Sequence, residues 1–245
     1  MKKRIKSFIK KIVFSIIKPP LGSAEVIYTS YAQAGEDVVM KFLFDQVQIQ
    51  NFTYLEIGVY YPDYCNNTFL FYKQGAKGVC VEADETLIPA IKTVRERDTV
   101  LNIGVGIKNE KQADFYIFDE KGLNTFSKEE AEHRANLGKY KIVKIAKVPL
   151  KTINEIISEN FPTYPHLLSI DIEGLDLAVL KTLHFERFPI PVICVETCTY
   201  SENHIKPKDK SIEVYMESAG YFAYADTYIN TIFVNRKWFE RPVDL

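Results

Sequence analysis

Acidic side chains stand at the ends of several apolar segments, and they are the residues in this sequence best suited to chemistry. They are Glu56, Glu82 with Asp84, Asp171 with Glu173, and Glu196. If those segments are neighbouring strands of a parallel sheet, their carboxyl ends lie at one edge and the acids converge on one crevice. Burying so much negative charge requires a partner, which is a cation, a set of hydroxyl groups or a shift in pKa. Any one of these acids could instead only cap the helix that follows its strand.

Strands that alternate with helices must position these acids. Strands are expected at 52–58, 77–82, 99–105, 167–172 and 191–196, helices at 30–46, 67–75, 84–97, 150–160, 174–184 and 208–219, and two strands joined by a turn at 221–235. Most of the strand segments are nearly continuous apolar runs, which is typical of strands buried on both faces. This order predicts an α/β fold with a mainly parallel sheet covered by helices on both faces. Within the polar stretch 108–147 we expect a short β segment and a charged, mobile segment at 127–139.

The glycine pattern argues against a ligand that carries a pyrophosphate group. A dinucleotide site requires G-x-G-x-x-G after a strand, and a P-loop requires its own glycine pattern. Gly58 is followed by VYYP, which contains no glycine. Gly104 and Gly106 match the first two glycines of G-x-G-x-x-G, but Asn109 stands at the position of the third. Glu82, at the end of the second strand, is well placed to hold ribose hydroxyl groups. Ribose without pyrophosphate, beside acids suited to a cation, indicates S-adenosylmethionine, whose sulfonium and amino groups are positive.

Charge and cysteine content restrict the partners and the compartment. The 245 residues carry a net charge of −1, but residues 1–18 hold seven basic side chains and no acid, which leaves −8 on the rest (24 basic against 32 acidic side chains). So acidic a body is not expected to bind nucleic acid, because neutralising phosphates requires clustered Lys and Arg. The four cysteines lack the spacing of a metal site, which favours a reducing compartment and a cytoplasmic protein.

Residues 1–20 predict a basic amphipathic helix. Its apolar positions are Ile5, Phe8, Ile9, Ile12, Val13, Ile16 and Ile17, and Pro19 and Pro20 end it. From Arg4 to Lys18 such a helix is about 22 Å long at 1.5 Å per residue, too short to span a membrane. Two interpretations stay open: peripheral contact with the inner face of the membrane through residues 1–18, or packing against this domain or a second copy of the chain.

From Tyr31 to about Asn235, the chain resembles the FkbM-type S-adenosylmethionine-dependent methyltransferases. The motifs are YAQAGEDVV (31–39), YLEIGVYYPDYCNNTFLFYKQGAKGVCVEAD (54–84), LNIGVG (101–106), PLKTINEII (149–157), LLSIDIEGLDLAVLKTL (167–183), PVICVET (191–197) and NTIFVN (230–235). The resemblance implies a methyltransferase domain over 21–245 with a Rossmann-like class I methyltransferase fold. That fold has a mainly parallel seven-stranded sheet with helices on both faces and an antiparallel C-terminal hairpin.

The sequence departs from the family pattern at three positions. Glu56 replaces the usual Asp, and Val59 stands where Ala is common. Glu56 keeps the charge, so we expect the loop after the first strand to work. Ser169 replaces a Lys that often precedes the acid of the fourth strand by two positions, so no role of that Lys carries over.

Carried over position by position, the resemblance also implies the residues that bind S-adenosylmethionine. The methionine part would contact Glu56 and Gly58, and its carboxylate would bind Asn67 and Thr68. The ribose would bind Glu82. The adenine would lie beside Ala83, Asp84, Asn102 and Gly104. Gln33 and Glu36 would fold over the cofactor, while Asp171 and Glu173 would face the transferred methyl group.

Methyl transfer to a hydroxyl group needs a general base or a metal ion, because a hydroxyl group is a poor nucleophile. Asp171 and Glu173 are the expected base or, together with water, ligands for Mg²⁺ or another divalent cation. His204, after the fifth strand, and His133, in the charged segment, are further candidates for the base. The resemblance favours a small-molecule or glycan acceptor, with a sugar hydroxyl of a surface polysaccharide or related glycoconjugate as the methylated group.

Two other functions remain alternatives at this point. Asp171-x-Glu173 after an apolar strand could hold the cation of a metal-dependent glycosyltransferase. A non-catalytic binding module on the same fold is the other alternative. Ligand binding separates the two alternatives. A glycosyltransferase must bind a nucleotide sugar, whereas a non-catalytic module could bind neither a nucleotide sugar nor S-adenosylmethionine.

Overall fold

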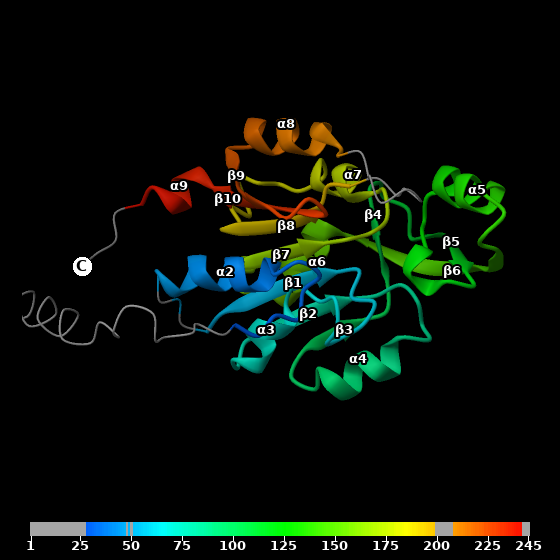
Figure 1. The fold of residues 1–245 in the computed structure, drawn as a ribbon, viewed down its shortest axis with the longest axis horizontal. Coiled ribbons are helices and arrows are strands. Elements are labelled where there is room, and N and C mark those ends of the chain that lie inside the picture. The colour runs from blue at the N-terminus through cyan, green and yellow to red at the C-terminus, as the bar shows by residue number, and fades with distance from the viewer. Residues whose placement is uncertain (1–27, 48, 50, 199–207, 242–245) are drawn as a thin grey trace, which may run out of the picture.

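The computed structural model describes residues 28–47, 49, 51–198 and 208–241. Figure 1 shows a large sheet with helices on both sides and a smaller group, β5, β6 and α5, at one end of the molecule. The predicted N-terminal helix of 1–20 and His204 lie outside the described residues, so the predicted division at residue 20 stays a prediction. No helix among the described residues is long and apolar enough to cross a membrane.

Seven strands form the main sheet. They are β1 (Thr53–Ile57), β2 (Lys77–Val81), β3 (Thr99–Leu101), β7 (Leu167–Ile170), β8 (Val192–Glu196), β9 (Tyr221–Asp226) and β10 (Asn230–Asn235). Their order is β3-β2-β1-β7-β8-β10-β9. The first five strands run parallel, and β10 is antiparallel to both β8 and β9. This arrangement confirms the predicted fold class, including the C-terminal hairpin.

Helices cover the sheet on both faces. They are α2 (Glu36–Asp45), α3 (Phe69–Lys73), α4 (Ile88–Val94), α6 (Ile153–Asn160), α7 (Asp176–Leu180), α8 (Lys210–Ser218) and, after β10, the short α9 (Arg236–Phe239). The predicted helices are present, but most begin later than expected. Helix α2 begins only at Glu36, because Gly35 adopts φ 90°. The carboxylate of Asp37 also accepts hydrogen bonds from Ser30 and Tyr31, which keeps that segment out of the helix.

Alternate residues of the strands supply two apolar cores. In β1, Leu55 and Ile57 pack with α6, α7 and α8 on one face, whereas Tyr54 packs with α2 and α3 on the other. A strand that is apolar on both faces is therefore buried between two helical layers, as the continuous apolar segments predicted. The site must then be built where the strands end.

A second sheet has the order β4-β6-β5, and of its strands β5 confirms the short β segment predicted within 108–147, whereas the sheet itself was not predicted. Its strands are β4 (Gly104–Gly106), β5 (Gln112–Phe118) and β6 (Ile142–Thr152), with the 3-10 helix η1 (Lys121–Leu123) and α5 (Lys128–Asn136) between β5 and β6. The predicted strand 99–105 is wrong as a single element, because the Asn102 amide donates to the carbonyl groups of Glu82 and Ala83 between β3 and β4. After Asn102 the chain enters the second sheet.

Two further expectations are corrected in this region. The predicted helix 150–160 begins only at Ile153, because residues 150–152 end β6 and Thr152 forms a capping box with Glu155. The segment predicted to be mobile, 127–139, instead contains α5, which the Ser127 side chain caps. Arg134 of α5 is 1% exposed, so this charged helix packs against the body of the protein.

Candidate active site

A cavity of about 250 Å³ lies at the carboxyl ends of β1, β2 and β7, beside the second sheet. Here the chain turns from one half of the sheet to the other, which is where open α/β sheets bind ligands. Seven of the predicted site residues line the cavity: Gln33, Gly58, Glu82, Ala83, Gly104, Asp171 and Glu173. Because the rest of the wall is largely apolar, these few polar groups would set the orientation of a ligand.

The end of β1 and the end of β7 meet at Gly58. This glycine adopts φ +83°, and a Cβ atom added to it would lie 1.9 Å from the carbonyl oxygen of Asp171. The Asp171 N–H in turn donates to the carbonyl group of Ile57 at 3.1 Å. A side chain at position 58 would therefore push Asp171 away, and the loop after β1 and the acid after β7 are fixed as one unit.

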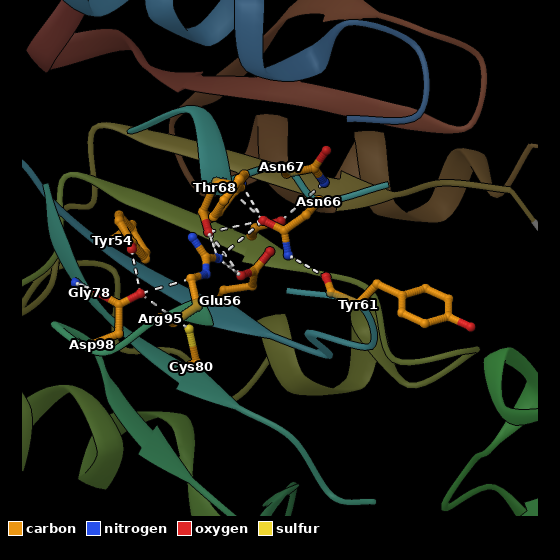
Figure 2. Close-up of polar contacts among 12 residues, drawn as sticks. Tyr54, Glu56, Tyr61, Asn66, Asn67, Thr68, Gly78, Cys80, Arg95 and Asp98 are labelled. Atoms are coloured by element: carbon orange, nitrogen blue, oxygen red, sulfur yellow. Dashed lines mark hydrogen bonds and ion pairs between the residues drawn. The ribbon is translucent and has the colours of Figure 1, made fainter. Parts of the chain in front are cut away.

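Glu56 does not reach the cavity. Its side chain points to the face of the sheet covered by α3, where its Oε2 lies 2.7 Å from Nη2 of Arg95 (Figure 2). The Thr68 hydroxyl group donates to the same oxygen at 2.8 Å. Burial raises the pKa of Glu56, and Arg95 opposes that rise. Sequence reasoning placed Glu56 against the methionine part of the cofactor, but here its charge is already paired.

Arg95 is the centre of this buried network and is fully buried. Beyond Glu56, its Nη2 lies within hydrogen-bond distance of Asn66 and Thr68, and its Nε is 3.8 Å from Oδ2 of Asp98. The rings of Tyr54, Phe69 and Tyr72 surround the guanidinium group with centroids 5.6, 5.2 and 5.3 Å from Cζ. Two carboxylates and three ring faces thus offset the desolvation of one cation.

Three acids form a cluster of which two, Asp171 and Glu173, line the cavity, whereas Glu196 does not. One carboxylate oxygen from each of Asp171, Glu173 and Glu196 lies within 4.8 Å of the others. Glu173 adopts φ +56°, and its Oε2 lies 2.7 Å from Nη2 of Arg134. The turn is held by Asp176, which accepts hydrogen bonds from the N–H groups of Ile172 and Gly174. Burial raises the pKa of Asp176 to about 6.

A comparison with protein families identifies the family of this chain. The model of the methyltransferase FkbM domain matches residues 56–223, more than half of the chain. The chain belongs to the FkbM methyltransferase family. It is therefore an S-adenosylmethionine-dependent methyltransferase, and the predicted enzyme class and family are confirmed. A comparison with curated proteins found no match.

Two solved structures align with this FkbM methyltransferase over most of its length. A TehB-like SAM-dependent methyltransferase from Corynebacterium glutamicum has 9% identity and a TM-score of 0.40, with 96% of this chain and 100% of that chain covered. A candidate RNA methyltransferase from Pyrococcus horikoshii has 10% identity and a TM-score of 0.41, with 92% of this chain and 97% of that chain covered. The assignment rests on the family match and not on these two similarities.

The FkbM methyltransferase offers a matching set of groups for the ribose of its cofactor at Glu82. This carboxylate is 7% exposed and lines the cavity. Oε2 accepts from the Tyr60 N–H at 2.9 Å and Oε1 from the Asp84 N–H at 2.8 Å. A carboxylate oxygen accepts about two hydrogen bonds, so the Glu82 carboxylate keeps capacity for a hydroxyl donor. A carboxylate held in one orientation by backbone N–H groups fits the hydroxyl edge of a ribose.

Several residues that sequence reasoning assigned to the cofactor instead support the walls. Asn67 donates to the Ser169 hydroxyl group at 3.2 Å, and Thr68 belongs to the Arg95 network. Glu36 is fully buried and accepts hydrogen bonds from Thr227 at 2.7 Å and from Asn230. It therefore ties α2 to the C-terminal hairpin.

The side chains of Asp84 and Asn102 also bind other parts of the protein and do not line the cavity. Asp84 accepts from the Thr86 N–H and from the side-chain amide of Asn124, which fastens the second sheet to the end of β2. The side-chain amide of Asn102 donates to the carbonyl groups of Glu82 and Ala83. His133 lies on the exposed side of α5 and does not line the cavity.

Several residues that line the cavity were not predicted from the sequence. They are Tyr60 and Tyr64 after β1, and Lys121, Gly122, Asn124, Thr125 and Phe126 beside the second sheet. Phe126 packs over Gly104, where a Cβ atom would lie 2.3 Å from its ring. The two buried arginines, Arg95 and Arg134, were also missed. The pairing of β5 with β6 brings residues 121–126 to the main sheet, and no local sequence pattern predicts that pairing.

Proposed function

We propose that this FkbM methyltransferase transfers the methyl group of S-adenosylmethionine to a hydroxyl group of a sugar, in a surface polysaccharide or related glycoconjugate. The observation that supports the proposal is that one cavity is lined by the carboxylate of Glu82 on one wall and by the carboxylates of Asp171 and Glu173 on another. The basic amphipathic sequence of residues 1–18 would suit a lipid-linked acceptor. Transfer of a labelled methyl group to glycans and lipid-linked oligosaccharides tests the acceptor class, and labelling of non-sugar acceptors alone would contradict it.

The residues of the chain have distinct tasks in this reaction. When bound, the cofactor supplies a methyl group activated by a sulfonium. Glu82 orients the ribose, and the apolar wall excludes water, so that much of the rate gain comes from alignment of the acceptor. The Asp171 carboxylate takes the proton of the acceptor hydroxyl group. Arg134 fixes the orientation of Glu173 beside it.

Binding of the demethylated product, S-adenosylhomocysteine, tests the role of Glu82. In Glu82→Gln, the new amide nitrogen would face the N–H of Tyr60 or Asp84, and the charge on the ribose acceptors is lost. Hydrogen bonds to charged groups contribute about 1.5–3 kcal/mol, so we expect the dissociation constant to rise by about 10- to 150-fold. Calorimetry measures it directly.

The matched control for this measurement is Glu85→Gln. Glu85 is three residues further along the chain, is 67% exposed and pairs with Lys144 at the surface, so its variant should bind like the wild type. Equal affinities for the wild type and Glu82→Gln would remove Glu82 from the ribose site. A wild-type protein that binds a nucleotide sugar in place of S-adenosylhomocysteine would contradict the proposed function itself.

Asp171, Glu173 and Glu196 also support a second role, as ligands of Mg²⁺ or another divalent cation. A bound ion would lower the pKa of the acceptor hydroxyl group and take the place of a general base. Because Arg134 already pairs with Glu173, we expect transfer to survive EDTA, measured as methyl incorporation with and without added Mg²⁺. Activity that EDTA abolishes and Mg²⁺ restores would assign these carboxylates to a metal site instead.

A further inference from the structure

Three tyrosines lie in the turn that follows β1. Tyr60 and Tyr64 line the cavity, and Tyr61 and Tyr64 are 44% and 67% exposed. The ring centroids are 4.2 Å apart for Tyr60 and Tyr61 and 6.1 Å apart for Tyr61 and Tyr64. The planes of neighbouring rings are inclined by 53° and 68°, so the three rings form a contiguous aromatic surface that is not flat, at the mouth of the cavity. Exposed aromatic surface next to a ligand cavity is typical of a binding site.

The backbone beneath these rings is held firmly. Tyr60 and Cys65 adopt φ angles of 51° and 50°, which residues other than glycine rarely adopt. The Tyr60 N–H is fixed by Glu82, and the Asn66 side chain donates to the Tyr61 carbonyl group at 3.1 Å. Figure 2 shows the Tyr61 ring projecting away from the buried network that anchors its backbone. The turn that carries the rings is thus held in place before any ligand binds, which lowers the cost of binding.

We propose that the rings of Tyr60, Tyr61 and Tyr64 form a platform on which a pyranose ring of the acceptor stacks. The proposal rests on the proposed function and names the shape of its acceptor. The face of an aromatic ring carries partial negative charge and attracts the polarised C–H groups on the apolar face of a pyranose. The hydroxyl groups at the edge of the sugar remain free to approach Asp171, which lines the same cavity.

The position of the platform favours the acceptor over the cofactor as its occupant. Tyr60 and Tyr64 line the cavity, but Tyr61 lies outside it, so the aromatic surface continues from the cavity onto the exterior. The predicted adenine neighbours, Ala83 and Gly104, belong to a wall built by β2 and β4. A group that extends out of the cavity over Tyr61 belongs to a larger molecule that enters from solvent.

Saturation-transfer NMR with methyl glycosides of common hexoses and deoxyhexoses tests the platform, using the full chain loaded with S-adenosylhomocysteine. We expect saturation of the ring C–H protons of at least one glycoside by the wild type. The signal should fall at least fivefold in the double variant Tyr61→Ala, Tyr64→Ala and persist in Tyr61→Phe, Tyr64→Phe, because Phe keeps the ring face. Phe42→Ala, which removes a 58% exposed ring of α2, is the matched control and should leave the signal unchanged.

The outcomes separate the platform from the function it serves. Absence of any glycoside signal, or an equal signal in the double Ala variant, would overturn the platform. Signals from phenols only, included as a second arm, would overturn the sugar assignment. Calorimetry of S-adenosylhomocysteine on the same samples reports on the proposed function alone, because a wild type that fails to bind it would contradict methyl transfer whatever the glycosides do.

Discussion

Asp171→Asn should slow methyl transfer by about 100- to 10,000-fold, the range that a general base contributes. Asn has nearly the same size as Asp but cannot accept the proton of the acceptor hydroxyl group. The hydrogen bond from the Asp171 N–H to Ile57 and the contact of its carbonyl oxygen with Gly58 are backbone features, so the variant keeps them. We therefore expect the loss in kcat, with the affinity for S-adenosylhomocysteine and the thermal midpoint close to the wild-type values.

Asp114→Asn is the control for this measurement. Asp114 is a carboxylate of β5 that pairs with Lys147 at the surface, with 44% of its side chain exposed. Its replacement should leave kcat unchanged. Near-normal turnover by Asp171→Asn would remove Asp171 from proton transfer and leave Glu173 as the candidate base.

Arg95→Met should lower the free energy of unfolding by about 3–5 kcal/mol, the cost of leaving a buried ion pair without one partner. Met fills much of the space of the Arg side chain, so the effect reports on charge more than on volume. Without the guanidinium group, Glu56 and Asp98 lose the cation that compensates them. Urea unfolding followed by circular dichroism measures the change.

The loss of stability in Arg95→Met should depend on pH through the Glu56 carboxyl group. Burial raises the pKa of Glu56 while Arg95 opposes the rise, so removing Arg95 raises this pKa further. A carboxyl group with a raised pKa in the folded state favours folding when protonated, and that contribution is lost as the pH rises. The deficit of Arg95→Met should thus shrink as the pH falls, and adding Glu56→Gln should recover part of it at neutral pH.

Arg97→Met provides the comparison within the same segment. Arg97 is exposed and lies over the Tyr72 ring, with its Cζ 3.9 Å from the ring centroid. Its loss should cost about 1 kcal/mol, the value of an exposed cation–π contact. If Arg95→Met cost no more than Arg97→Met, the buried network would not be what stabilises this part of the fold.

The main sheet could be predicted because each of its inner strands is an apolar run followed by a helix. The acids after β2 and β7, Glu82 and Asp171, were found for the same reason, since residues just beyond a parallel strand face the ligand edge. Glu56 differs because it lies within β1, not beyond it. Side chains in a strand alternate, so Leu55 and Ile57 face one core and Glu56 faces the other, where only the fold brings Arg95 to it.

The second sheet could not be predicted because its long strand lacks the usual pattern. In β6, Val143 and Ile145 are 62% and 55% exposed, and lysines lie among the apolar residues. Neither alternation nor a continuous apolar run marks such a segment as a strand. Its pairing with β5 is a tertiary contact that overrides local preference.

Residues 121–126 complete the cavity from outside the main sheet, and contacts with both sheets hold them there. Asn124 donates to Asp84 at 3.1 Å, and the Thr125 hydroxyl group donates to the Glu173 carbonyl group at 3.3 Å. Asp171, the proposed proton acceptor, and this part of the cavity wall thus come from different segments of the chain. Exchanging this short stretch between relatives, with its contacts to both sheets retained, would reshape one wall of the cavity while leaving Glu82 and Asp171 in place.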